Sequence, residues 1–112
     1  MKITKAVGPP RPRAGFLISA DHVERFRLPS FVVDRTFERG IWKQMNKEFG
    51  TEIDEYEGVS LDPGDLKKAS EIIRQDLNQD LDAPNDYAEF LRRAADMLQR
   101  SADRHVAVMF SL

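Results

Sequence analysis

The chain has 112 residues, of which 41% are hydrophobic and 32% are charged, and its formal net charge is −2. This length is typical of one domain. The absence of cysteine excludes disulfide scaffolds, thiolate metal sites and cysteine nucleophiles. No stretch has the apolar length of a signal peptide or a membrane span, so we expect a cytosolic protein without a membrane partner.

The first segment is rich in proline and arginine. Three prolines in VGPPRPRAG favour an extended conformation, and Pro9 and Pro12 form a PxxP pattern. We therefore expect residues 1–14 to form a flexible leader and residues 15–112 to form a single domain.

Two strands are predicted next. GFLIS, residues 15–19, is apolar on both sides, which is typical of a buried strand. Residues 23–33 place Phe26 and Leu28 on one side and Arg25 and Arg27 on the other. Because one side is charged and a proline interrupts the run, we expect an edge strand.

A helix is predicted over residues 35–49, because apolar residues recur there at steps of four. Asp34 would cap its start, and Gly50 would end it in the left-handed conformation. Residues 51–58 would then form a loop that leads into a short strand. The apolar residues of the helical stripe are Phe37, Ile41, Met45 and Phe49.

Two further helices follow. Asp62 stands at the N-cap of the first, and Pro63 occupies its first helical position. APND, residues 83–86, separates it from the second, whose apolar face runs from Tyr87 to Ala102.

The chain ends on an apolar run, residues 106–112, that predicts an inner strand. Neither side of it carries a charge, so we expect both faces to be covered, with the helix at 35–49 or a second subunit over the Ala107–Met109 side. The predicted fold is α+β: a small mixed or mostly antiparallel sheet of three or four strands with about three helices and an inner C-terminal strand. A homodimer through the Ala107–Met109 face is a further expectation.

The segment between the first and second predicted helices is the strongest candidate binding site. Four acidic residues surround a tyrosine there, and a tyrosine flanked by charge is typical of interface centres. This pattern predicts a surface that binds another protein, one with a basic surface, and the alternative interpretation is a merely solvated loop. The predicted protein-binding residues are Glu52, Asp54, Glu55, Tyr56 and Glu57.

An alternative site lies on the helix predicted at 35–49. Arg35, Arg39, Lys43 and Lys47 recur every four residues, and a basic helical stripe can follow phosphates. Acidic residues on the same helix and the net negative charge of the chain argue against nucleic acid as a partner.

The two histidines, His22 and His105, are the remaining candidates. If the first and last strands are antiparallel neighbours, both imidazoles come together near Asp21 and Asp103, a set that a divalent metal could use. No local metal-ligand spacing supports this, so solvated turn histidines are the favoured interpretation.

No phosphate loop, nucleophile elbow, zinc-protease or calcium-loop motif is present. We therefore expect no cofactor and no catalytic residues, and a non-enzymatic interaction module such as an inhibitor, adaptor or immunity-like protein. Nucleic-acid association through the stripe at 35–47 is the alternative. A ligand pocket built from dispersed residues stays open as a third class.

Overall fold

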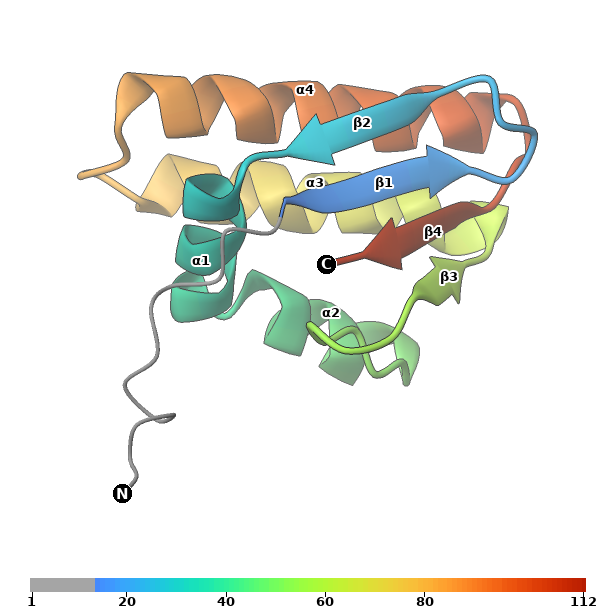
Figure 1. Cartoon of the computed structure of the whole chain (residues 1–112), viewed down its shortest axis with the longest axis horizontal. Helices are drawn as coiled ribbons and strands as arrows, with labels where there is room; N and C mark the ends of the chain where they lie inside the picture. Colours follow the sequence, from blue (N-terminus) through green and yellow to red (C-terminus); the bar gives the residue numbers. More distant parts are fainter. Residues whose placement is uncertain (1–13) are drawn as a thin grey trace.

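The computed structural model describes residues 14–112, so the predicted leader lies outside the described residues except for Ala14. The described part contains four strands and four helices (Figure 1). The strands are β1 (Gly15–Ser19), β2 (Arg25–Leu28), β3 (Val59–Leu61) and β4 (Val108–Ser111), and the helices are α1 (Ser30–Arg39), α2 (Ile41–Phe49), α3 (Pro63–Gln79) and α4 (Asn85–Asp103).

The strands form one antiparallel sheet with the order β2-β1-β4-β3. The prediction of an α+β fold with an inner C-terminal strand is therefore confirmed. Phe16 lies between Arg27 on β2 and Ser111 on β4, and Ile18 lies between Arg25 and Met109. This register decides which side chains share a face of the sheet.

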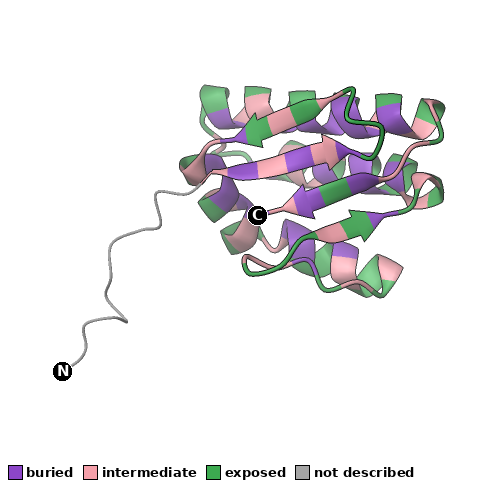
Figure 2. Cartoon of the chain, turned by 45° about the vertical axis from the view of Figure 1, so that its right-hand side comes forward, coloured by how far each residue is buried: buried purple, intermediate pink, exposed green. Residues whose placement is uncertain are grey.

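The helices pack on one face of the sheet, which makes a two-layer structure (Figures 1 and 2). Leu17, Val108 and Phe110 point into this layer and are fully buried. Phe110 contacts Trp42 of α2 edge-to-face at 5.7 Å between ring centroids, so α2 covers the same face as α3 and α4. We call this covered face the inner face.

The helix predicted over 35–49 is wrong in two respects. Residues 30–33 were expected to continue the edge strand, but α1 begins at Ser30, directly after Pro29, so Asp34 lies within a helix rather than at its cap. The helix also breaks at Gly40, whose φ of 76° ends α1 in the left-handed conformation. The predicted helix is consequently two helices, and the described residues contain four helices in place of the expected three.

The expectation that the helix at 35–49 covers the Ala107–Met109 side of β4 is also wrong, and the alternative, a second subunit over this side, stays a prediction. Met109 is 38% exposed and Ser111 is half-buried, whereas Val108 and Phe110 between them are buried. The segment 35–49 packs on the inner face, because the break at Gly40 turns α2 toward Phe110. The Ala107–Met109 side therefore has no helix of residues 14–112 over it.

Ion pairs fix the end of the sheet where β1 turns into β2. Arg104 at the end of α4 bonds to Asp21 at 3.2 Å and to Glu24 at 2.8 Å, and Arg100 bonds to Glu24 at 2.6 Å. These contacts hold the turn against α4.

No helix in residues 14–112 combines the length and the apolar character needed to cross a bilayer.

Candidate functional site

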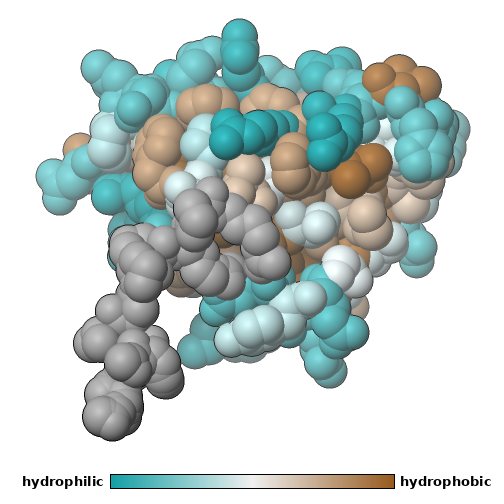
Figure 3. Space-filling view, in the orientation of Figure 1, coloured by the Kyte–Doolittle hydropathy of each residue, from teal (hydrophilic) through white to brown (hydrophobic). Residues whose placement is uncertain are grey.

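The uncovered side of the sheet, which we call the outer face, carries a strip of apolar side chains. Phe16 and Ile18 of β1 and Met109 of β4 alternate with inner residues and point outward. Figure 3 shows hydrophobic side chains gathered over the strands on this side. An apolar surface on a protein of this size that no helix covers is typical of an interaction site.

Two arginines border the strip along the edge strand β2. Arg25 and Arg27 alternate with the inward residues Phe26 and Leu28 and are exposed. The guanidinium carbon of Arg25 lies 4.1 Å from the centroid of the Phe16 ring, which is a cation–π contact. Arg27 forms no ion pair with another residue in 14–112. This edge of the outer face is therefore positively charged.

The opposite edge carries the loop that was predicted as an acidic protein-binding site. Asn46 of α2 holds its start: Asn46 Oδ1 accepts from the Ile53 amide at 2.7 Å, and Asn46 Nδ2 donates to the Ile53 carbonyl at 3.0 Å. Ile53 is itself buried. The loop is thus anchored to the helical layer and presents the residues that follow.

Asp54 has a structural task within this loop. Its carboxylate accepts from the amides of Tyr56 at 2.8 Å and Glu57 at 3.0 Å. These two hydrogen bonds hold the pKa of Asp54 below its ordinary value. They also fix the turn that leaves the Tyr56 side chain 80% exposed. Of the five predicted residues, Asp54 therefore shapes the loop, Glu55 is half-buried, and Glu52, Tyr56 and Glu57 are exposed.

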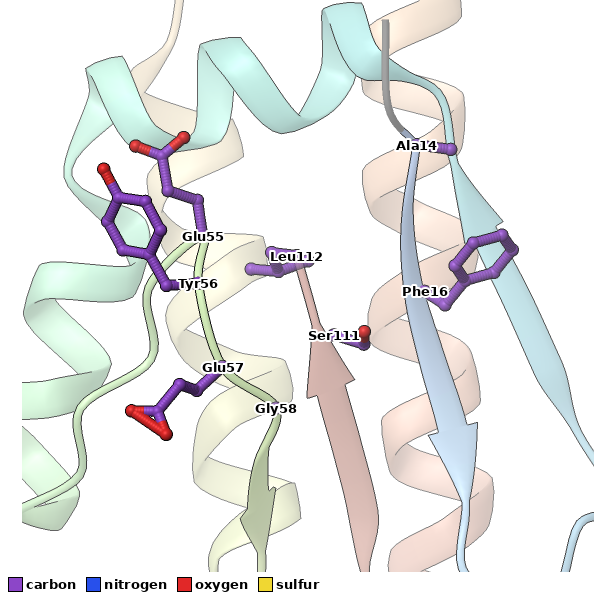
Figure 4. Close-up of a pocket in the computed structure, with 8 residues that line it drawn as sticks. All are labelled: Ala14, Phe16, Glu55, Tyr56, Glu57, Gly58, Ser111 and Leu112. Carbon is purple, nitrogen blue, oxygen red and sulfur yellow. The ribbon is translucent and has the colours of Figure 1, made fainter. Parts of the chain in front are cut away.

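A groove of about 170 Å³ joins the loop to the outer face (Figure 4). Glu55, Tyr56 and Glu57 lie on one side and Phe16 on the other, and Figure 4 shows the two rings pointing away from each other across Ser111 and Leu112. Gly58, which follows the loop, lies next to the strip. A Cβ at this position would lie 3.1 Å from the sulfur of Met109. The acidic loop and the apolar strip therefore form one continuous surface.

The basic residues proposed for nucleic acid do not form an open stripe. Arg35 bonds to Asp80 at 2.7 and 3.0 Å, and Arg39 bonds to Asp76 at 3.0 and 3.2 Å. These pairs raise the pKa of both guanidinium groups and lower that of Asp80. A phosphate would have to displace two carboxylates, and the other two candidates, Lys43 and Lys47, lie beyond the break on α2.

The two histidines lie in turns at the same end of the sheet, since β1 and β4 are antiparallel neighbours as the metal hypothesis required. Both have positive φ, 61° at His22 and 58° at His105. Within residues 14–112, no group of three His, Asp or Glu side chains is placed to hold a metal ion. His105 shares a hollow of about 410 Å³ with Asp103 and with Lys67, whose charge opposes a cation.

Asp21, the other carboxylate of the metal hypothesis, is engaged in the turn. It accepts from Ser19 Oγ at 2.7 Å and from the Val23 amide at 3.1 Å, in addition to its pair with Arg104. These bonds, the one from Ser19 first, lower the pKa of Asp21 to about 2. The side chain therefore stabilises the β1–β2 turn as a charged acceptor.

Sequence reasoning missed the residues that complete the surface. Phe16, Ser111 and Leu112 form the groove with the loop only because β1 pairs with β4. The alternation of Arg25 and Arg27 was recognised as an exposed side, but its position beside Phe16 depends on the strand register. The single signal available was the uncharged second side of β4, which was attributed to burial under a helix or a second subunit.

Comparison of the chain with protein-family models, with curated proteins and with solved structures gives no match.

Proposed function

We propose that this protein is a non-enzymatic protein-interaction module, and that its binding surface is the outer face of the sheet together with the acidic loop. The observation that carries this proposal is the continuity of the apolar strip with the groove beside Tyr56. An exposed tyrosine next to an apolar floor, with charge at the rim, is the arrangement found at interface centres.

The groove is too small for an ordinary small-molecule site. Its volume of about 170 Å³ is below the roughly 300–1,000 Å³ of ligand pockets. It suits one apolar side chain of a partner protein, placed over Ser111 and Leu112. The carboxylate of Glu57 at the rim favours an arginine or lysine next to that side chain.

A random peptide library panned against the immobilised protein tests the proposal. We expect enriched peptides that pair a basic residue with a large apolar one, and we expect the double substitution Tyr56→Ser with Glu57→Lys to abolish their binding. Glu48→Lys is the matched control, because Glu48 is an exposed acid on α2 outside the surface. No enrichment, or binding that survives the double substitution but not Glu48→Lys, would contradict the proposal.

The nucleic-acid alternative is separated by retention on immobilised DNA. It predicts retention that falls steeply with salt and disappears when Lys43 and Lys47 become glutamate. The proposed module predicts no difference between this variant and the wild-type chain.

A further inference from the structure

The outer face has a basic edge, an acidic edge and an apolar strip between them. We propose that the surface binds a second copy of this chain, in a face-to-face dimer whose two-fold axis runs along the strands. This inference rests on the proposed function and names its partner.

The two edges of the face have opposite charge. Arg25 and Arg27 lie along β2 at one edge, and Glu57 lies in the loop before β3 at the other. The apolar strip of β1 and β4 separates them. A surface with one basic edge, one acidic edge and an apolar centre is complementary to itself when one copy is turned over.

The strand register fixes which turn brings the opposite charges together. A two-fold axis parallel to the strands exchanges the edges, so that β2 of one copy faces the acidic loop of the other. An axis perpendicular to the strands would instead place arginine against arginine, which is repulsive. The charges therefore select the axis that runs between β1 and β4, with the tilt of about 30° that sheet twist imposes on packed sheets.

Two rows of side chains meet in this arrangement. Rotation about the strand axis keeps a residue at its height, so Ile18 of one copy lies opposite Met109 of the other, because these residues are register partners on β1 and β4. Arg27 shares its row with Phe16 and Ser111, and the acidic loop reaches the end of the same row through the groove. Arg27 of each copy therefore faces Glu57 of its partner.

The outer face is small, which indicates a weak dimer. With a strand spacing of about 4.8 Å and a rise of about 3.3 Å per residue, four short strands present on the order of 300 Å² of flat surface. Stable interfaces bury about 800 Å² on each partner, so the dimer is of the weak, reversible class.

Sedimentation equilibrium of charge-reversed variants tests the proposal. We expect the wild-type chain to associate reversibly, and Arg27→Glu and Glu57→Arg each to raise the Kd by about tenfold or more through like-charge contacts. An equimolar mixture of the two variants should associate again, within about threefold of the wild type, because both contacts in the mixed dimer then join opposite charges. Thermal melting of each variant establishes that it remains folded.

Three results would overturn the dimer. The wild-type chain could remain monomeric to millimolar concentration, the single variants could associate as the wild type does, or the mixture could fail to recover. Nuclear Overhauser contacts from residues 1–13 to the Ile18 and Met109 methyl groups that persist on dilution would also overturn it, because the chain's own first segment would then occupy the face.

Failure of the dimer is distinguishable from failure of the proposed function. If peptide binding is lost in the Tyr56→Ser, Glu57→Lys variant while the wild-type chain stays monomeric, the surface binds another protein and only the dimer is wrong. Arg27→Glu then provides a second discrimination, since a basic partner that uses the acidic edge alone binds this variant as it binds the wild type.

Discussion

The inner and outer faces of the sheet are built from the same two central strands. Leu17 and Phe110 point inward and are fully buried under α2, α3 and α4, whereas Phe16 and Met109, one residue away on the same strands, point outward and keep contact with solvent. The alternation of β-structure thus divides similar apolar side chains into a core and a surface. Apolar character alone therefore does not show which face holds the fold together, since that depends on where the helices pack.

The largest expected effect lies on the inner face. Phe110→Ala removes a fully buried ring that contacts Trp42, and we expect it to lower the free energy of unfolding by about 3–5 kcal/mol. Urea denaturation followed by circular dichroism measures this loss. A loss below about 1 kcal/mol would contradict the assignment of the inner face as the core of the fold.

Acid is expected to loosen the end of the sheet held by ion pairs. Hydrogen bonds, first the one from Ser19 and then those from the Val23 amide and Arg104, lower the pKa of Asp21 to about 2. Bonds from Arg100 and Arg104 lower the pKa of Glu24. Because both carboxyl groups have a lower pKa in the folded state than in the unfolded state, their stabilisation is complete above about pH 5 and is lost as the pH falls toward 2. The melting temperature should therefore decrease over this range.

The matched variant for this prediction is Arg104→Gln, which removes a partner of both carboxylates. It should melt lower than the wild type at pH 7, and the two melting temperatures should converge toward pH 2. An equal difference in melting temperature between the two proteins at pH 7 and at pH 2 would show that these ion pairs do not stabilise the turn against α4.

The break between α1 and α2 is a smaller test of the same comparison. Gly40→Ala places a side chain at φ 76°, where an L-residue is strained, and should cost about 1 kcal/mol although no atom lies within 4 Å of the new Cβ. Gly64→Ala on α3, where the space is equally open, should cause no loss. Equal effects of the two substitutions would show that the left-handed turn does not direct α2 onto the inner face.

The smallest effect on stability is expected on the outer face. Met109→Thr keeps a residue that favours strands and removes an exposed apolar side chain, so the free energy of unfolding should change by less than about 0.5 kcal/mol. The same substitution should weaken self-association, because Met109 lies opposite Ile18 of the second copy. Denaturation and sedimentation of one sample give both values.

Much of the fold could be predicted from local pattern. The uncharged C-terminal run indicated an inner strand, and Asp62 followed by Pro63 indicated the start of α3, because both signals depend on neighbouring residues alone. The break at Gly40 could not be placed, since a glycine within an apolar stripe is compatible with a continuous helix. Only packing of α2 against Phe110 shows that the chain turns there.

The candidate site was less accessible to prediction. The acidic loop was found because its charges are adjacent in sequence, but the Phe16 and Leu112 sides of the groove come from opposite ends of the domain. The prediction that the helix at 35–49 covers the outer face is wrong because Met109 has the same character as a core residue, whereas the second subunit stays a prediction. Its exposure depends on which side the four helices pack, which no stretch of sequence specifies by itself.

The most direct test of self-association through the outer face is nuclear magnetic resonance of the methyl groups as the wild-type chain is diluted from about 1 mM to about 10 µM, over which a weak, reversible dimer should dissociate. If the dimer forms through the outer face, the Ile18 and Met109 methyl signals shift with concentration while those of Leu17 and Val108 stay constant. Signals of Ile18 and Met109 that do not move across this range, or equal shifts on both faces, would contradict it.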